Sequence, residues 1–472
     1  MSLTKYMNSN IINKKQNLLI NIIFAFFPIS LLLGNLIVNL NFLLFCALGI
    51  IILKLNFLKI KFNLPFKFIF IFFCIIVLST LVSFITHLYY GETYYVNLNN
   101  LIKSVLFFRF FLMLIIIYHL NKLNILNFKY FFFVGGTLAA LISLDIIFQY
   151  LFGFNIVGLP SYGFHNTSFF ADEMIAGGFV LRFCLFSLFF SIFILSEKNY
   201  VNFFLITFLI VVLGMGILLS GNRMPFLFYF FALFLTIFFN KELRKYIVTG
   251  ILLLSVTCWC LFALDATYKK NYQSIYGNII NISNLLISPL NKNSDIVKTK
   301  KINKIRFGAE VPMFESAQRR LFLTAIDTWK LSKVLGNGFK SFRKVCEKLD
   351  KKFNMQEDMV VYFIPHEASY EENRLCSNHP HNYYFEILTE LGAIGILITL
   401  IMAYLFLFFI FNNFKSFNQH KLDFMILSAA TLSLIVEMFP LKSSGSLFTT
   451  SNATYIILIV SILLCNKKLL KI

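Results

Sequence analysis

Arg223 is the first residue whose position could carry chemistry. It closes the stretch Ser220-Gly-Asn-Arg223, directly after an apolar run long enough to cross a membrane. A guanidinium at the edge of a membrane is costly to bury unless an anion or a carboxylate lies beside it. An arginine at such a position can also extend toward lipid headgroups. The position of Arg223 therefore predicts either an anion-binding site or a headgroup contact.

A second cationic site is the pair Arg319-Arg320, which opens an expected helix over residues 316–333. Apolar residues recur there at helical spacing, and Leu335-Gly-Asn-Gly338 is expected to end the helix. The planar fork of guanidinium donors suits phosphate oxygens. The pair therefore predicts either a phosphate contact or two solvated arginines on an exposed helix.

The third stretch contains His379 and His381, shortly before an apolar run at 383–411. A histidine at the mouth of a membrane helix can accept a proton from a hydroxyl group near neutral pH, because its unperturbed pKa is about 6.5. The alternative is a histidine that only bonds to the backbone at a helix start. Gly392 and Gly395, inside the following run, indicate close helix packing rather than chemistry.

The composition determines which elements must position these residues. The sequence is 58% hydrophobic and only 14% charged, which excludes intrinsic disorder, collagen and a water-soluble enzyme. Apolar runs of roughly 17 to 25 residues suit membrane helices and not the short alternating strands of an outer-membrane barrel. We therefore expect an all-α polytopic membrane protein with about 12 transmembrane helices. The expected spans are residues 17–34, 36–53, 66–87, 103–120, 129–152, 174–195, 201–219, 224–240, 246–264, 383–411, 421–439 and 448–465.

The charge distribution predicts the orientation. The formal net charge is +20, from 42 Lys+Arg and 22 Asp+Glu. Cytoplasmic loops of inner-membrane proteins collect Lys and Arg, so we predict no nucleic-acid partner. With twelve spans and both termini in the cytoplasm, most basic residues outside the large loop fall on the cytoplasmic side. The start of the chain lacks a signal-peptide cleavage site, so we expect a retained first helix.

One connection differs in kind from the others. Residues 266–382 are too polar to span the membrane and too long for a simple connector. We expect them to form a mainly helical periplasmic domain between the ninth and tenth spans. This domain would separate transmembrane helices 1–9, in residues 1–265, from helices 10–12, in residues 383–472.

The cysteines agree with this division. Of the 8 cysteines, Cys346 and Cys376 lie in the expected periplasmic domain, and the others lie in or at the edges of apolar spans. A disulfide between these two is expected in an oxidising compartment. The competing reading is a metal site in which Cys376 joins His366, His379 and His381. Because no paired CxxC or HExxH motif accompanies them, we predict no metal.

Together and in this order, the three stretches resemble the O-antigen ligase and O-antigen polymerase family, membrane glycosyltransferases of the GT-C type with an enlarged periplasmic loop. The resemblance covers about residues 140–460. SGNR at 220–223 is similar to the family's Ser-rich stretch ending in Arg. Arg319 and Leu323, with LGNGF at 335–339, resemble its Arg-x-x-x-Leu motif and Leu-Gly-x-Gly turn. HNYYFEILTELGAIG at 381–395 is similar to its His-Asn-x-Tyr and Glu-x-Gly-x-x-Gly segment.

The resemblance implies that Arg223, Arg319 and His381 are the catalytic residues. The segment from Gln149 to Glu173 also looks like family members, although this chain has His165-Asn166 where relatives often have an arginine. The predicted substrate-binding residues are Arg320, His379, Asn382, Asp172 and Glu173.

The implied reaction moves a glycan from undecaprenyl pyrophosphate to an acceptor hydroxyl on the periplasmic face of the bacterial inner membrane. Arg223 and Arg319 would neutralise the pyrophosphate leaving group, and His381 would act as general base, with inversion and without a metal or other cofactor. A ligase uses lipid A-core as acceptor. The alternative is a polymerase that joins lipid-linked repeat units.

Two functions of other classes remain open. A polysaccharide transporter predicts internal repeats with broken spans in matching positions, which the sequence lacks. A structural partner in an envelope assembly predicts that Arg319 and His381 are dispensable. Charged groups in or at the edges of spans would either line a lipid groove or pair with one another, and these are Arg109, Asp145, Arg182 and Glu437.

Overall fold

The computed structural model describes residues 14–54, 63–90, 96–195, 199–273, 317–351, 375–413, 422–443 and 445–465. The described residues form helices joined by turns and loops. The loop that follows residue 152 contains two isolated β-bridges. The helices are α1 (Lys14–Ala25), α2 (Phe27–Leu33), α3 (Asn35–Leu53), α4 (Leu64–Tyr90), α5 (Leu98–Phe107), α6 (Arg109–Lys122), α7 (Phe128–Phe152), η4 (Ser168–Phe170), α8 (Ala176–Ile194), α9 (Tyr200–Leu219), α10 (Arg223–Phe239), α11 (Arg244–Leu264), a helix at 266–273, α13 (Ala317–Leu331), α14 (Phe342–Lys351), α15 (Tyr383–Asn413), α16 (Leu422–Glu437) and α17 (Thr450–Leu464).

The prediction of an all-α polytopic membrane protein is confirmed. Each of the twelve expected spans coincides with one helix or with two consecutive helices. Among the described residues, 8 helices are long and apolar enough to cross a membrane, or 9 if the pair α1 and α2, bent by 42°, is one span. The apolar helices α10 and α17 are shorter. The fold class therefore holds, while twelve crossings remain a prediction.

Close packing in the bundle depends on small residues where helices meet. Gly136 of α7 faces α8 so closely that a Cβ atom there would lie 2.9 Å from the backbone nitrogen of Ser187. Lipid tails are as apolar as the side chains, so helices in a membrane associate through such close contacts rather than through the hydrophobic effect. Aromatic rings fill the remaining space, as where Phe183 packs against Phe186 and Tyr455.

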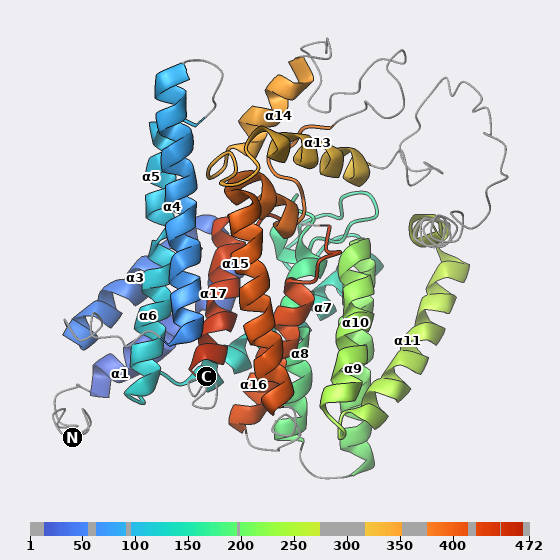
Figure 1. Cartoon of the computed structure of the whole chain (residues 1–472). Helices are drawn as coiled ribbons and strands as arrows, with labels where there is room; N and C mark the ends of the chain where they lie inside the picture. Colours follow the sequence, from blue (N-terminus) through green and yellow to red (C-terminus); the bar gives the residue numbers. More distant parts are fainter. Residues whose placement is uncertain are drawn as a thin grey trace, which may run out of the picture.

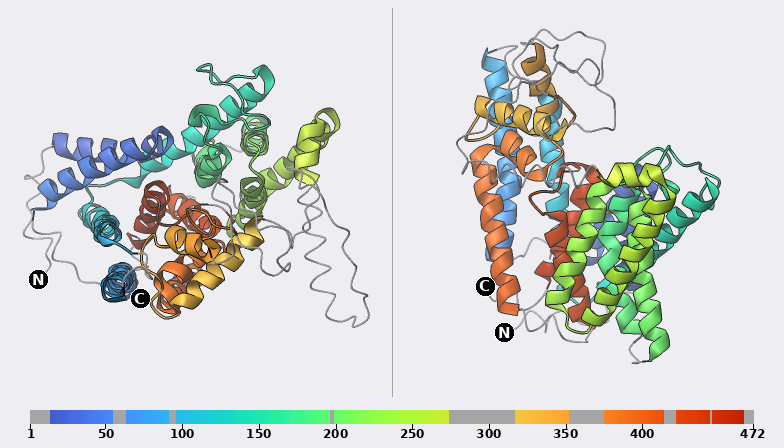
Figure 2. Two further views of the ribbon diagram at one scale, coloured as in Figure 1. Left: turned by 90° about the horizontal axis from the view of Figure 1, so that it is seen from above. Right: turned by 90° about the vertical axis from the view of Figure 1, so that its right-hand side faces the viewer.

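Helices α13 and α14 cover one end of the bundle, which we call the capped end (Figure 1). The expected helix at 316–333 is confirmed as α13. It lies across the tops of the long helices, from above α10 to above α15, and the view from above in Figure 2 agrees. A small apolar core of its own holds the cap together, formed by Leu321, Ala325, Phe342 and Cys346. Phe322 of α13 stacks on Phe385 of α15 with the ring centroids 4.7 Å apart, which ties the cap to the bundle.

Helix α15 is broken at Gly392, where the backbone has φ 65° and ψ −162°. The turn after α13 fits into this break. The backbone nitrogen of Gly338 donates to the carbonyl of Glu390 at 3.0 Å, and that of Ala393 donates to the carbonyl of Lys333 at 2.9 Å. A Cβ on Gly336 would lie 2.4 Å from the carbonyl carbon of Glu390, and one on Gly392 would lie 2.3 Å from the Val334 carbonyl oxygen. The two glycine motifs therefore form one joint between cap and membrane helix.

Candidate functional site

Arg223 is the first residue of α10, at the capped end. Its Nη2 lies 3.5 Å from Oδ1 of Asn271. The preceding turn is tight, because Gly221 has φ +76° and a Cβ there would lie 2.5 Å from Nδ1 of His165. That imidazole nitrogen lies 3.1 Å from the carbonyl oxygen of Ser220. Burial lowers the pKa of His165, and the charge of Arg223 lowers it further. His165 therefore packs as a neutral ring against the turn that presents Arg223.

The loop between α7 and α8 holds this turn from the other side. Asn166 donates to the carbonyl of Leu219 at 2.7 Å and lies 2.8 Å from the hydroxyl of Tyr268. Asn222 donates to the carbonyl of Met174 at 2.9 Å. The segment His165-Asn166 thus supports the position of Arg223.

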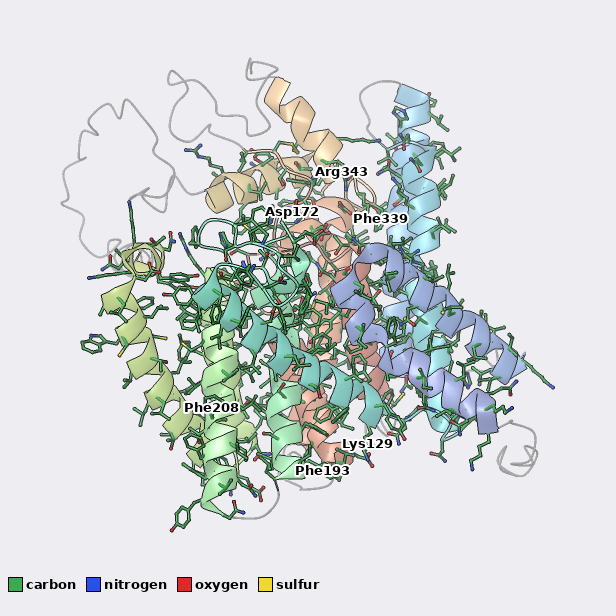
Figure 3. The ribbon with its side chains drawn as sticks, turned by 180° about the vertical axis from the view of Figure 1, so that it is seen from behind. Lys129, Asp172, Phe193, Phe208, Phe339 and Arg343 are labelled. Atoms are coloured by element: carbon green, nitrogen blue, oxygen red, sulfur yellow. A yellow bond between two sulfur atoms is a disulfide. The ribbon has the colours of Figure 1, made fainter. Side chains whose placement is uncertain are left out.

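Asp172 and Glu173 lie in the same loop, and both are exposed. Figure 3 shows Asp172 toward the capped end, on the same side as Arg343 and far from Lys129 and Phe193. Substrate binding by these two carboxylates remains a prediction.

Arg319 and Arg320 occupy the first turn of α13. The side chain of Arg319 lies outside the described part of the structure, whereas Arg320 is half-buried. Because α13 starts above α10, its first turn and Arg223 belong to the same region of the capped end (Figure 1).

His379 and His381 stand together just before α15, with ring centroids 4.2 Å apart. Nε2 of His381 lies 3.4 Å from the Ser377 hydroxyl, and the backbone of His381 has φ 55°. Burial lowers the pKa of His381, so its imidazole is neutral at pH 7. Burial, then the charges of His381 and Arg343, lower the pKa of His379 to about 4. A neutral imidazole at this position can accept a proton from a hydroxyl group.

The residues after His381 fasten the loop at 438–447, between α16 and α17. Asn382 donates through Nδ2 to the carbonyls of Pro440, at 2.7 Å, and Lys442, at 3.1 Å. The hydroxyl of Tyr384 donates to the carbonyl of Met438 at 2.5 Å. The buried Asn382 side chain therefore has a positioning role in this structure, and a direct contact with substrate remains a prediction.

Two further side chains of the same segment bind this loop and the end of α16. The hydroxyl of Tyr383 donates to Oε1 of Glu437 at 2.6 Å. The carboxylate of Glu386 accepts hydrogen bonds from the hydroxyl of Ser446, at 2.5 Å, and from the backbone nitrogen of Leu447, at 2.6 Å. Four of the five residues that follow His381 thus hold residues 437–447 beside the histidine pair.

A buried charge cluster lies under this loop. Arg182 of α8 makes two contacts to the Glu437 carboxylate, Nη2 to Oε1 at 3.0 Å and Nε to Oε2 at 3.3 Å. Nζ of Lys442 lies 2.7 Å from Oε2 of the same carboxylate. Burial lowers the pKa of Lys442 even though Glu437 acts to raise it. Charged groups in the spans were expected either to line a lipid groove or to pair with one another. Arg182 and Glu437 pair with one another.

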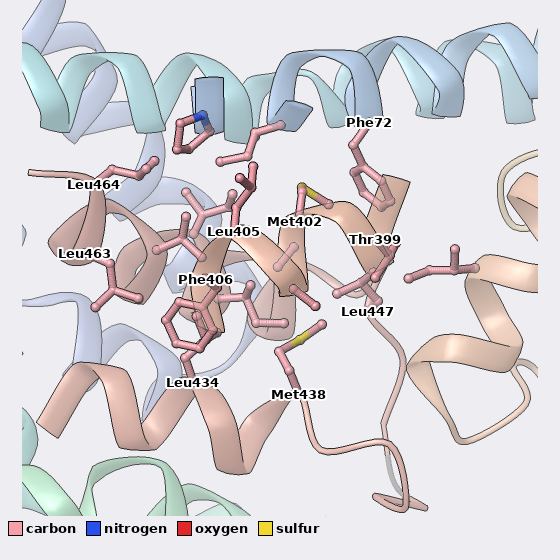
Figure 4. A pocket seen from close by; sticks show the side chains of 18 of the residues that line it. Phe72, Thr399, Met402, Leu405, Phe406, Leu434, Met438, Leu447, Leu463 and Leu464 are labelled. Atoms are coloured by element: carbon pink, nitrogen blue, oxygen red, sulfur yellow. The ribbon is translucent and has the colours of Figure 1, made fainter. Parts of the chain in front are cut away.

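An apolar cavity of about 530 Å³ opens between α4, α6, α15, α16 and α17 (Figure 4). Its walls carry Phe72, Met402 and Leu434, and the loop at 438–447 contributes Met438 and Leu447. Such a cavity within membrane helices suits a lipid chain. The histidines were found from the sequence pattern, but this cavity and Lys442 were not. In the expected topology, Lys442 lies between the last two spans on the periplasmic side, where lysine and arginine are rare. That unusual position is the sequence signal that points to Lys442.

The structure joins Cys346 of α14 to Cys376 in a disulfide, with the Cα atoms 5.4 Å apart. This bond fixes the segment leading to His379 and His381 onto α14. Within the described ranges, which leave out His366, no group of three or more His, Cys, Asp and Glu residues could hold a metal ion.

These observations define a class: a multi-pass helical membrane protein with cationic and imidazole groups gathered at the capped end, above an apolar cavity. Residues 208–400 match the family model described as O-antigen ligase (Wzy_C), and this match supports the O-antigen ligase family. The matched family implies a transferase of lipid-linked glycans. No curated protein matches the chain.

Proposed function

We propose that this protein is a glycosyltransferase of the ligase type, which moves a glycan from undecaprenyl pyrophosphate to a hydroxyl group of lipid A-core. In this proposal the capped end faces the periplasm of a bacterial inner membrane. The observation that carries it is the common location of the starts of α10, α13 and α15, which contain or adjoin Arg223, Arg319 and His381 (Figure 1).

The proposed reaction is a single displacement. His381 takes the proton of the acceptor hydroxyl, and the resulting oxygen forms a bond to the anomeric carbon of the donor. The bond from that carbon to the pyrophosphate oxygen breaks, and the leaving group keeps the electron pair. Arg223 and Arg319 neutralise the charge that grows on it. Attack from the face opposite the leaving group inverts the anomeric configuration.

The test is a pair of substitutions, Arg319→Ala and His381→Ala, in cells lacking the chromosomal gene. We expect both variants to insert into the membrane and to leave lipid-linked polymer unattached. Lys330→Gln, which removes an exposed charge from the same helix, serves as the control. Wild-type lipopolysaccharide ladders from either alanine variant would favour a structural role. Accumulation of single-repeat lipopolysaccharide would instead indicate a polymerase.

A metal requirement provides a second test. Since the two guanidinium groups take the place of a divalent cation in this scheme, the purified protein should retain activity in excess chelator. Loss of activity that returns only with added divalent metal would contradict the scheme.

A further inference from the structure

Lys442 has no role in the reaction as described, yet its surroundings are unusual. It lies in the loop at 438–447, and its side chain is only 11% exposed. Its Nζ lies 5.5 Å from the centre of the Tyr383 ring and 2.7 Å from Glu437. A buried ammonium group is costly unless its charge is balanced and its donors are used.

The charge of Lys442 is not balanced within this cluster. Arg182 already pairs with Glu437 through two nitrogen atoms, at 3.0 and 3.3 Å. The same carboxylate also accepts a hydrogen bond from the hydroxyl group of Tyr383. Two cations therefore share one carboxylate, which leaves one positive charge in excess. An ammonium group can donate three hydrogen bonds. Lys442 donates one of them to Glu437.

The loop that carries Lys442 joins the histidine site to the apolar cavity. Asn382, next to His381, binds the carbonyl of Lys442 at 3.1 Å. Met438, Pro440 and Leu447, on either side of Lys442 in the loop, line the cavity. In Figure 4, Met438 and Leu447 lie on the cavity wall close to the segment that leaves α16. Lys442 is thus in the stretch of chain between a lipid-sized cavity and a catalytic histidine.

We propose that Lys442 binds the pyrophosphate group of an isoprenoid lipid whose chain occupies the cavity. This inference rests on the proposed function, to which it adds a third cation. An isoprenoid chain fits the site because the lining is apolar and lies within membrane helices, while the excess positive charge lies in the loop at its border. Arg182 neutralises Glu437, so that the charge of Lys442 remains available to the ligand.

The experiment measures binding of undecaprenyl pyrophosphate and undecaprenyl monophosphate to the full-length protein in phosphatidylcholine nanodiscs by native mass spectrometry. The variants are Lys442→Gln and the double variant Lys442→Gln with Glu437→Gln. The double variant removes one positive and one negative charge, so the net charge of the cluster stays at the wild-type value. It also removes Glu437, which loses its contact to Lys442 in the single variant. Lys330→Gln is the matched control, since it removes an exposed lysine of the cap.

We expect both Lys442 variants to bind undecaprenyl pyrophosphate about tenfold more weakly, which corresponds to one charge-assisted hydrogen bond. The monophosphate should lose less affinity, and Lys330→Gln should bind like the wild type. Wild-type affinity in the double variant would overturn the inference, because Lys442 would then be only a counter-ion of Glu437. Displacement of the probe by equimolar phosphatidylglycerol would also overturn it, in favour of a general headgroup contact. Absence of binding by the wild-type protein would instead contradict the proposed function itself.

Discussion

The starts of α15 and α10 lie at the same capped end, but their polar side chains are held very differently. After His381, four side chains bond to residues 437–447, with distances of 2.5 to 3.1 Å. At α10 the turn before Arg223 is rigid, yet the hydrogen bond from the guanidinium to Asn271 is 3.5 Å long. Both proposed roles, general base and charge-stabilising cation, need a fixed position. Side-chain hydrogen bonds hold the loop after His381, whereas the backbone turn holds the start of α10.

The largest expected effect comes from Arg223→Gln, which tests the α10 side of this comparison. Loss of one charge-stabilising donor should lower kcat by about 10² to 10³-fold. The thermal unfolding temperature should change little, because glutamine keeps a hydrogen-bond donor on the side of Asn271. Lys270→Gln, at an exposed position in the helix at 266–273, is the control. A large drop in stability would show that Arg223 is instead part of the packing.

Gly392→Ala tests the α15 side of the comparison. The backbone there has φ +65°, and a Cβ would lie 2.3 Å from a carbonyl oxygen, so we expect a loss of about 3 kcal/mol or more. Thermal unfolding in detergent measures it, with activity falling in parallel. Gly178→Ala is the matched control, since a Cβ there meets nothing within 4 Å. An unchanged unfolding temperature for Gly392→Ala would mean that the joint between cap and α15 is not needed for stability.

Loss of the disulfide should have a smaller effect on stability, also on the α15 side of the comparison. Cys376→Ser, or reduction, should cost about 2 to 4 kcal/mol and lower activity, because the segment before His379 is released from α14. The unfolding curve with and without reductant measures this. Cys260→Ser, at an exposed position of α11, controls for thiol chemistry elsewhere. Equal curves for wild type and Cys376→Ser would contradict a positioning role.

The smallest effect is the response to pH. Burial lowers the pKa of His381 below its usual value of about 6.5, so the imidazole of this proposed base is neutral at pH 7. A plot of kcat/KM against pH should therefore be level around neutrality and fall on the acidic side only below about pH 6.5. An acidic midpoint above pH 7 would contradict this environment for His381. Arg223→Gln should keep the wild-type midpoint, since it alters charge stabilisation and not the base.

Stability should fall over the same acidic range for a separate reason. The unfolded chain protonates His379 near pH 6.5, but the folded protein does so only near pH 4. The unfolded state thus binds more protons in that window, and folding loses free energy as the pH falls through it. Activity assays should be paired with unfolding measurements at each pH to separate the two effects.

Much of the fold followed from local pattern. The lengths of apolar runs predicted the helices because each membrane helix satisfies its own backbone hydrogen bonds. Helix α13 was predicted from the helical spacing of its apolar residues and from the glycines that follow it. Gly392 was read as a packing residue, and the structure adds that it breaks α15 at a contact with Gly336. That contact joins residues more than fifty positions apart, which no local pattern specifies.

The membrane class, the helices and the three stretches that carry arginine and histidine follow from the amino-acid sequence alone. The residues that those stretches contact depend on how the chain folds. Asn382 reaches a loop 58 residues away, and Ser79 binds the carbonyl of Glu390 across 311 residues. Only folding brought Lys442 and Arg182 to one carboxylate. The physical reason is that helix formation depends on neighbouring residues, whereas the balance of buried charges depends on partners that packing alone brings within reach.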